Sequence, residues 1–573
     1  MTSIVSLEEL AQCVPDSIRL GIGGVHLSRL PIALIRRIIE LGRKNFTFTS
    51  WGGGLPLELL LEANAVRKLI FCFSSLDIFG LAPRFREALE KNTIEVEEWS
   101  ALAMIQALHA AHYQVPEMPF QLPIGSDLMS SGDFWRTGES AFTGEPIGHA
   151  RRLDIDVLLL HAQRADTKGN IEIQTSRGLD LAMLGAAKRT LVTVEEIVDV
   201  GKLGAPLAFV LPNTFVTAIA QVPGGAYPTS CLPYYSTDYS ELLNYVRAKK
   251  STGFTFTEPR KTFLGKAAST RIPDLTPQLV EKHRLPVPDD APFTIDELLA
   301  VTLAREYDNN SICSVGSVSP LAMVSYLLAK ATHAPELIII ALNGSLIDID
   351  AHPMSLTLAE PLEFGSAKVI WGADESYHWY YQQGRITHEV ITVAQVDVRG
   401  RTNNAWVDAG GKRVRLPGQG GMADVANLHQ NFVLYLTRHS RDRFVESVRF
   451  CTAARGIPGP VRLISDLGVF QIDRAEGVFR LLSLHPGVSL ETVKESTGGD
   501  FLVADPLPVT TPPTAEELRL IRHRIDPFGI RRLEFVPGRD RLDLIQSILD
   551  AEAALVNDIA KSSLGVTLVR SKH

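Results

Sequence analysis

The 573-residue sequence lacks the features that mark several large classes of protein. Its five cysteines are widely scattered, with no CxxC motif and no Cys/His spacing typical of a zinc site, so we expect reduced thiols and no metal centre. No run of about 18 apolar residues is present, which argues against a membrane-spanning helix. The amino-terminal residues lack the basic patch and apolar core of a signal peptide. Together these absences predict a cytoplasmic protein.

Charge and motifs exclude further classes. The 57 basic and 65 acidic residues give a net charge of −8, with no long basic run, so we expect no nucleic-acid or membrane partner. The sequence has no GK[ST] loop, no complete dinucleotide fingerprint, no GxSxG elbow and no HExxH motif. P-loop and dinucleotide sites, α/β-hydrolases and zincins are therefore disfavoured.

What the sequence does contain is a long alternation of β-rich apolar runs and helical stretches. The run IRLGIGG ends on Gly23 and Gly24, and a helical stretch that starts at Pro31 follows it. Such units of strand, glycine turn and helix repeat along the chain and are typical of an α/β fold with parallel sheets. Two later runs, residues 448–453 and 468–473, alternate like antiparallel strands.

A change of composition divides the chain. Residues 252–291 are rich in proline, charge and threonine, so we expect an extended linker between a first domain, residues 1–251, and a second, residues 292–573. The two parts share landmarks in the same order, which suggests two related domains. These landmarks are proline-started helices at Pro31 and Pro320, and two loops that hold Gln163, Asp166, Gly169 and Asn170 in one part and Gln395, Asp397, Gly400 and Asn403 in the other. Chance similarity between loops rich in glycine and aspartate is the alternative.

Several residues have the chemistry for a site, although each also has an ordinary structural explanation. Glycine turns such as Gly418–Gly421 leave backbone N–H groups able to face an anion, but tight turns need glycine too. Glu98 follows a strand and could act as a base, or lie in a solvated loop. Cys313 could be a thiolate, but a buried structural cysteine is favoured. The apolar run LIIIAL breaks into Asn343 and Gly344, which places these residues at a sheet edge.

An ordered set of motifs resembles one enzyme family. The motifs GIGG, SRLP, FCFSSLD, HAQRAD, VTVEEIV and VPGGAYP are similar to the first subunit of the glutaconate-type family I CoA-transferases. The motifs SVGSVSPLAM, VAQVD, RLPGQGGMAD and HPGVSLE are similar to the second subunit. The resemblance covers nearly the whole chain, with the linker where the two subunits would be fused.

The resemblance implies an α/β protein made of two tandem CoA-transferase-fold domains, with mainly parallel sheets and peripheral antiparallel strands. It implies an acyl-CoA thioester bound between the domains, coenzyme A as part of the substrate, no permanently bound cofactor, and a homo-oligomer. The residues that it places against the thioester and the pantetheine are Gly23, Gly24, Gly316, Ser317, Gly418, Gln419, Gly420 and Gly421.

One position departs from the family. The transferases carry a glutamate in a turn of the form E-S-G or E-N-G, and its carboxylate attacks the thioester to form covalent intermediates. The corresponding triplet here is Leu342, Asn343 and Gly344, and leucine cannot form an acyl anhydride. Some members of the superfamily catalyse decarboxylation or hydrolytic ring opening instead, and the hydrolytic ones place a carboxylate near Ser100 or Ala101.

We therefore expect an acyl-CoA hydrolase or lyase in which Asn343 and Gly344 hold the thioester and Glu98 is the candidate base. Two alternatives stay open. The chain could be a genuine CoA-transferase that uses another carboxylate, or an acyl-CoA-binding protein without catalysis.

Overall fold

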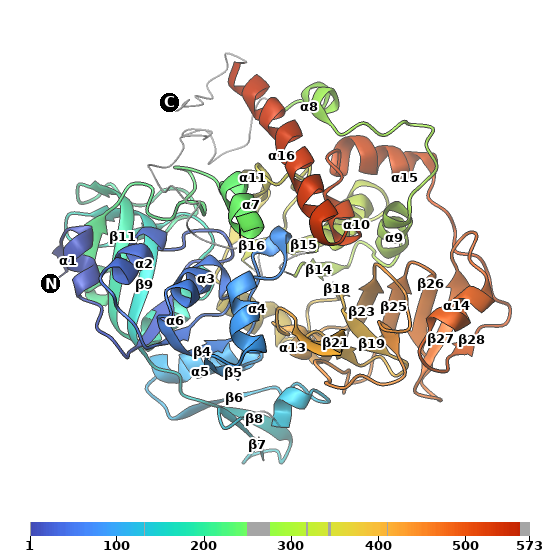
Figure 1. The fold of residues 1–573 in the computed structure, drawn as a ribbon, viewed down its shortest axis with the longest axis horizontal. Coiled ribbons are helices and arrows are strands. Elements are labelled where there is room, and N and C mark those ends of the chain that lie inside the picture. Colours follow the sequence, from blue (N-terminus) through green and yellow to red (C-terminus); the bar gives the residue numbers. More distant parts are fainter. Residues whose placement is uncertain are drawn as a thin grey trace.

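The computed structural model describes residues 2–130, 132–248, 275–316, 319–341, 345–409 and 411–561. Two large sheets carry helices on their faces and lie side by side, one in each half of the chain (Figure 1). Five parts of the predicted site and linker lie outside the described residues, namely Ser317, Leu342, Asn343, Gly344 and residues 252–274.

The first sheet has the strand order β1-β13-β11-β9-β2-β3-β4-β5, and all neighbours along this path are parallel. These strands are β1 (Ser3–Ile4), β2 (Arg19–Ile22), β3 (Phe46–Thr49), β4 (Val66–Phe71), β5 (Glu95–Glu98), β9 (Ile155–Asp166), β11 (Ala187–Val198) and β13 (Ala218–Gln221), with β10 (Ile171–Ile173) and β12 (Phe209–Leu211) added antiparallel. The helices are α1 (Leu7–Gln12), α2 (Ile32–Glu40), α3 (Gly54–Glu62), α4 (Pro83–Glu90), α5 (Ala101–His112), α6 (Asp180–Ala186) and α7 (Tyr239–Ala248). A separate antiparallel sheet consists of β6 (Glu117–Phe120), β7 (Trp135–Glu139) and β8 (Pro146–Arg151).

The second sheet has the order β17-β16-β15-β14-β18-β23-β25-β26-β27-β28, with a parallel centre and antiparallel pairs toward both edges. Its strands are β14 (Ile312–Ser314), β15 (Ile338–Ala341), β16 (Leu346–Ile347), β17 (Val369–Ile370), β18 (His388–Thr392), β23 (Asn431–Leu436), β25 (Val461–Ser465), β26 (Gly468–Ile472), β27 (Phe479–Leu484) and β28 (Leu502–Val503). Smaller pairings involve β19 (Gln395–Asp397), β20 (Thr402–Asn403), β21 (Trp406–Ala409), β22 (Lys412–Arg415) and β24 (Phe444–Val445). The helices are α8 (Pro277–His283), α9 (Ile295–Ala304), α10 (Pro320–Ala331), α11 (Ala359–Ser366), α12 (Ala373–Ser376), α13 (Met422–Leu428), α14 (Leu490–Ser496), α15 (Ala515–Arg519) and α16 (Gly538–Lys561). The predicted α/β fold with mainly parallel sheets and peripheral antiparallel strands is confirmed.

The two sheets repeat the same central topology. The parallel order β3-β2-β9-β11-β13 in the first half corresponds to β15-β14-β18-β23-β25 in the second. In both halves the second strand of this order, β2 or β14, is followed by a helix, α2 or α10, and then by the neighbouring strand, β3 or β15. This correspondence agrees with the predicted relation between the domains, because chance similarity of loops would not reproduce a strand order.

The matched loops have the same geometry, with one shift in register. The Oδ1 atoms of Asp166 and Asp397 each accept hydrogen bonds from the backbone N–H groups two and four residues further on, at 2.9–3.1 Å. Asn170 therefore corresponds to Arg401 and not to Asn403, which stands two residues beyond. The aspartate side chain fixes this turn, so the turn and not the asparagine is the repeated feature.

Two other expectations are wrong. The described part of the predicted extended linker contains the helix α8, whose N-cap Thr276 accepts a hydrogen bond from the N–H of Leu279. Proline at the first helical position, Pro277, is compatible with a helix start, so proline content alone was a poor indicator of an extended chain. Residues 448–453 form an irregular segment with a single bridge at Ala453, whereas β26 is the antiparallel strand expected.

The last helix, α16, joins the halves. Its apolar residues Ile545, Ile548 and Leu549 belong to a core cluster made chiefly of first-half residues. The guanidinium of Arg541 donates to the carbonyl oxygen of Ile78 at 2.8 Å. Residues 538–561 therefore pack on the first half although they follow the second sheet in the sequence (Figure 1).

A buried ion network fixes the segment before α16 to α9. The carboxylate of Glu297 accepts two hydrogen bonds from Arg522, at 2.7 and 2.8 Å, and one from Arg531 at 3.1 Å. Arg531 also pairs with Asp526 at 2.8 Å and with Asp296 at 2.7 Å. All these groups are buried, so each charge is tolerated only because an opposite charge pairs with it.

We predict that Glu297→Ala lowers the free energy of unfolding by about 3–5 kcal/mol, because it leaves the buried guanidinium of Arg522 without its carboxylate partner. The measurement is urea denaturation followed by tryptophan fluorescence. As a control, Glu516→Ala removes an exposed pair with Arg519 and should leave the free energy of unfolding nearly unchanged, because solvent screens that pair. Equal effects of the two substitutions would contradict the structural role given to Glu297.

Candidate active site

A cleft of about 610 Å³ lies between the two halves and is lined by both of them. Its volume falls in the range of about 300–1,000 Å³ that is usual for small-molecule sites. Seven of the residues predicted to bind the thioester and the pantetheine are brought together here from three separate stretches of the chain. Those in the lining are Gly23, Gly24, Gly316, Gly418, Gln419, Gly420 and Gly421.

The second-half loop that carries Gly418–Gly421 is held by the first half. The N–H of Gly420 donates to the carbonyl oxygen of Cys72 at 3.0 Å, and the N–H of Ser74 donates to that of Pro417 at 2.9 Å. The side chain of Gln419 donates to the carbonyl oxygen of Trp99 at 2.6 Å. The loop is thus fixed against the ends of β4 and β5, and its conformation depends on both halves.

Close packing explains why this loop is rich in glycine. Gly418 has φ +109° and Gly420 has φ +57°, both in the region that favours glycine. A Cβ at Gly418 would lie 2.8 Å from the carbonyl oxygen of Cys72, and one at Gly421 would lie 2.4 Å from the Tyr377 hydroxyl. Side chains at these positions would clash with these atoms and displace the loop from its contacts with the first half.

Gly23 and Gly24, in the first half, do not offer free backbone N–H groups to an anion. The N–H of Gly23 already donates to the carbonyl oxygen of Leu159 at 3.0 Å, and that of Gly24 donates to the Asp180 carboxylate at 2.7 Å. A Cβ at Gly23 would lie 2.1 Å from the Leu160 side chain. These glycines therefore shape the cleft wall, and their N–H groups are already used by protein acceptors.

Glu98 stands behind the glycine loop and is not among the residues that line the cleft. Its carboxylate pairs with Arg415 at 2.8 Å and accepts the N–H of Gln419 at 3.2 Å. Arg415 is 1% exposed, and its guanidinium lies over the rings of Phe71, Phe85 and Trp406 at 5.0–5.6 Å. This geometry fits a group that positions the loop better than one that takes a proton from a ligand.

A second carboxylate, which the sequence reasoning missed, does line the cleft. Glu389 on β18 is 9% exposed, and its Oε2 is buried without a hydrogen-bond partner. The Oε2 atom lies 3.8 Å from Nδ1 of His429, too far for a hydrogen bond, and both ring nitrogens of His429 are also without hydrogen-bond partners. Burial raises the pKa of Glu389 to about 7, although hydrogen bonds from Ser314 and Tyr381 favour the ionised form. Burial lowers the pKa of His429 to about 3, so this ring is neutral.

One signal in the sequence could have indicated Glu389. The central strands of a parallel sheet covered on both faces are normally apolar throughout, and HEVITVAQV carries a glutamate near the start of such a run. A charged residue in a buried strand requires an explanation.

The surroundings of several other reactive or aromatic side chains are defined. His26 lines the cleft, and its Nδ1 lies 2.9 Å from Asp77 Oδ1. Cys313 is fully buried, and burial raises the pKa of its thiol well above the usual range, which agrees with a structural cysteine. In the aromatic stretch, Tyr377 and Tyr381 stack at 4.4 Å and line the cleft, whereas Trp379 is exposed.

One group has the composition of a metal site. Ligand atoms of His161, Glu195 and Cys231 lie within 4.8 Å of one another. Both ring nitrogens of the histidine already have hydrogen-bond partners, because they lie 2.8 Å from Thr193 Oγ1 and from Glu195 Oε1. The absence of a metal centre stays a prediction. Among the described helices, none has the length and apolar character to cross a membrane.

The fold and the family are shown by comparison with known proteins. The fold resembles that of the acyl-CoA transferase YdiF from Escherichia coli O157:H7, with a TM-score of 0.66 over 90% of this chain and 96% of that one; at 14% identity this shows the fold alone. The family model described as coenzyme A transferase matches residues 4–221 and 297–496, more than half of the chain. The chain belongs to the coenzyme A transferase family.

Members of this family with similar sequences have different reactions. The chain is 33% identical to one subunit of the 3-oxoadipate CoA-transferase from Pseudomonas knackmussii over 244 residues, which are 42% of this chain and 85% of that subunit. It is 31% identical to the other subunit of the same enzyme over 250 residues, 40% of this chain and 92% of that subunit. It is also 28% identical to the cholesterol ring-cleaving hydrolase IpdA subunit from Rhodococcus jostii over 258 residues, 43% of this chain and 87% of that subunit. The prediction of a CoA-transferase superfamily enzyme with two subunits fused in one chain is confirmed.

We predict that Glu98→Gln loosens the glycine loop of this CoA-transferase family enzyme, because it removes the charge that pairs with buried Arg415. The affinity for coenzyme A, measured by calorimetry, should fall about tenfold, in line with ~1.5–3 kcal/mol for a hydrogen bond to a charged group. Amide hydrogen exchange at Gly420 should become faster.

Glu97→Gln is the matched control, since Glu97 is the neighbouring residue on β5 and pairs instead with Lys68. Unchanged affinity and exchange in Glu98→Gln, together with loss of turnover, would show that Glu98 is a base and not a positioning residue.

Proposed function

We propose that this member of the coenzyme A transferase family is an acyl-CoA hydrolase or lyase that acts on a thioester bound in the cleft between its halves. The proposal includes coenzyme A as part of the substrate and no permanently bound cofactor. A homo-oligomeric assembly and a cytoplasmic location belong to the same proposal. The assembly rests on the family resemblance of the sequence, and the location rests on the scattered cysteines and on the character of the amino-terminal residues.

The observation that carries the proposal is a cleft of the right size, built from both halves and completed by glycine loops, in a chain that has leucine at position 342. β15 ends at Ala341, directly before the triplet that aligns with the transferase turn. A leucine side chain has no lone pair with which to attack a thioester. The carbonyl of a bound thioester can still be polarised and attacked by water or lose a neighbouring proton to a base.

A side pocket gives room for the acyl group. It has a volume of about 190 Å³ and shares four wall residues with the main cleft, namely His26, Asp77, Gly316 and Ser319. Ala341 also lines it, next to the position of the transferase turn. Its other walls are mostly apolar, and an apolar cavity of ~150 Å³ is large enough to bind benzene. We propose that a short or medium acyl chain lies here while the pantetheine arm lies along the glycine loops.

Transferase activity is the second candidate function, because the cleft does contain a carboxylate, Glu389. A carboxylate that attacked the thioester would form an acyl-glutamyl anhydride and then a glutamyl-CoA thioester. Acyl-CoA binding without catalysis is the third candidate, and it is favoured if esters bind but none reacts. Covalent trapping separates the three.

We predict that the native protein, incubated with a panel of acyl-CoA esters, gives no glutamyl-CoA adduct after treatment with borohydride or hydroxylamine. Leu342→Glu should gain such an adduct at position 342, together with transfer of CoA to an added carboxylic acid, because it restores the nucleophile in the aligned turn. Mass spectrometry of the digested protein locates the adduct, and Leu342→Gln is the control of similar size without a nucleophilic carboxylate. An adduct in the native protein would overturn the hydrolase or lyase proposal in favour of a transferase.

A further inference from the structure

One oxygen of the buried Glu389 carboxylate is left without a hydrogen-bond partner. A buried acceptor left without a hydrogen bond costs about 1–3 kcal/mol, and the Oε2 atom of Glu389 is in this state. Its counterpart in the same wall, Glu534, shows the difference. Glu534 Oε1 accepts the N–H of Leu321 at 2.7 Å and its Oε2 accepts the hydroxyl of Tyr435, so Glu534 ties α10 to β23.

The position of Glu389 allows its carboxylate to act on a ligand bound in the cleft. In the sheet register it lies directly beside Ser314 on β14, which in turn lies beside Ile340 on β15, two residues before Leu342. Glu389 is therefore two strands away from β15, the strand that ends directly before the residues aligned with the transferase turn. Its Oε1 lies 3.5 Å from the point that a Cβ on Gly316 would occupy, so the carboxylate faces the part of the cleft wall that Gly316 forms.

The groups around Glu389 do not neutralise it. Tyr326, Tyr377, Tyr381 and His429 are the titratable residues that face it. Burial raises the pKa values of the three tyrosines well above their ordinary value, so they stay protonated. The hydroxyl of Tyr381 and that of Ser314 are hydrogen-bonded to each other and restrain the carboxylate from one side. No basic partner bonds to Glu389 within the described part of the chain, since the nearest ring, His429, is neutral.

We propose that Glu389 is the catalytic base of this enzyme, a carboxylate supplied from β18 in place of the one that the turn after β15 lacks. The inference rests on the proposed acyl-CoA hydrolysis. Glu389 takes a proton from a water molecule whose oxygen attacks the thioester carbonyl carbon. The carbon–sulfur bond then breaks, and the CoA thiolate leaves with the proton that Glu389 holds, which gives a carboxylic acid and free CoA.

The protonation state of Glu389 predicts the pH dependence. A base must be ionised, and the pKa of Glu389 is raised to about 7. Turnover should therefore be low below that pH, rise through it and level off above it. A residue that acted only in packing would not impose this profile.

The test compares Glu389→Gln with the native enzyme and with Glu534→Gln, a buried glutamate of the same wall. Glu389→Gln should lower kcat by about 10²–10⁴-fold, the usual contribution of a general base, and should lose the rise in rate near pH 7. Glu534→Gln should keep that rise whatever its rate. The same pH profile in Glu389→Gln as in the native enzyme would overturn the proposal.

A single-turnover reaction in ¹⁸O-water distinguishes a base from a nucleophile. A base places the label only in the released acid, whereas a nucleophilic Glu389 would carry label in its own carboxylate after turnover. Label in Glu389 would overturn the role as a base.

A measurement without turnover separates this inference from the proposed function. Infrared difference spectra between pH 6 and pH 8 should show a carboxyl band that is absent in Glu389→Gln and that shifts when S-hexyl-CoA, an unreactive thioether, binds. If no ester reacts but this band responds to the thioether, the proposed hydrolysis fails while the contact between Glu389 and the ligand stands. No response to the bound thioether would overturn the inference itself.

Discussion

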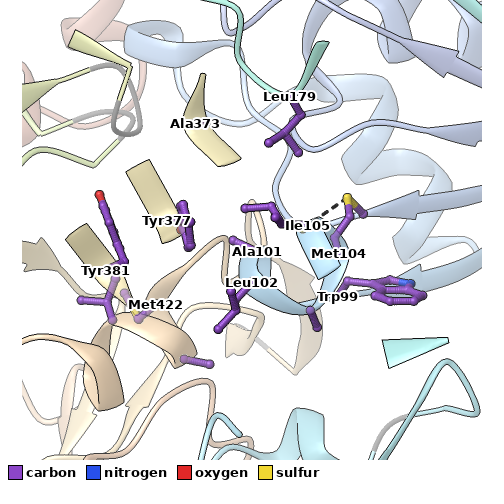
Figure 2. Packing of buried hydrophobic residues seen from close by; sticks show 14 of the residues in the cluster. Trp99, Ala101, Leu102, Met104, Ile105, Leu179, Ala373, Tyr377, Tyr381 and Met422 are labelled. Atoms are coloured by element: carbon purple, nitrogen blue, oxygen red, sulfur yellow. Dashed lines mark hydrogen bonds between the residues drawn. The ribbon is translucent and has the colours of Figure 1, made fainter. Parts of the chain in front are cut away.

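The structure depends on backbone hydrogen bonds that each half donates to the other across their interface, which we call the seam. The N–H of Ala101, at the start of α5, donates to the carbonyl oxygen of Gly420 in the second half at 3.2 Å. The N–H of Ala373, at the start of α12, donates to the carbonyl oxygen of Gly178 in the first half at 2.7 Å. Each half thus satisfies a helix N-terminus of the other with a glycine loop, as expected for two related domains packed face to face. Figure 2 shows Ala101 and Ala373 in the apolar cluster that surrounds this seam, together with Leu179, Tyr377 and Met422.

Polar groups are also buried in the interface between the two halves, and each of them needs a partner there. Asp424 on α13 is 2% exposed, and its carboxylate accepts the N–H of Leu102 at 2.9 Å, so the second half caps a helix of the first. An anion at a helix N-terminus is favoured by the helix dipole, but burial still dominates and raises the pKa of Asp424 to about 7. Because these contacts form only when both halves are in place, the cleft between them is a property of the whole chain. Fusion of the two parts in one polypeptide keeps them together at every concentration.

Much of this arrangement was predictable from the sequence, because it rests on local patterns. The strand and helix alternation, the glycine loops at Gly23 and Gly418, and the repeated aspartate turn each depend on residues close together in the chain. The turns at Asp166 and Asp397 show the limit of such patterns. The sequence pairs Asn170 with Asn403, whereas the backbone hydrogen bonds pair it with Arg401, two residues earlier.

The functions of single carboxylates were not predictable in the same way. Glu98 follows a strand in sequence, but its partner Arg415 is more than 300 residues away, so nothing local indicated the ion pair. Glu389 stands in a largely apolar strand, where a glutamate is unusual, but only the folded sheet shows that its side chain meets the cleft. Which side chains line an interface between two domains is decided by tertiary packing, and sequence patterns contain little information on it.

We propose one CoA thioester site built from both halves of the chain, with Glu389 at its wall. A crystal structure of the complex with S-hexyl-CoA tests this arrangement. The sulfur atom should lie between Gly24 and Gly420, with the Glu389 carboxylate within about 4 Å of the first carbons of the alkyl chain, the distance of a van der Waals contact. A ligand bound to one half alone, or with its sulfur atom remote from Glu389, would contradict it.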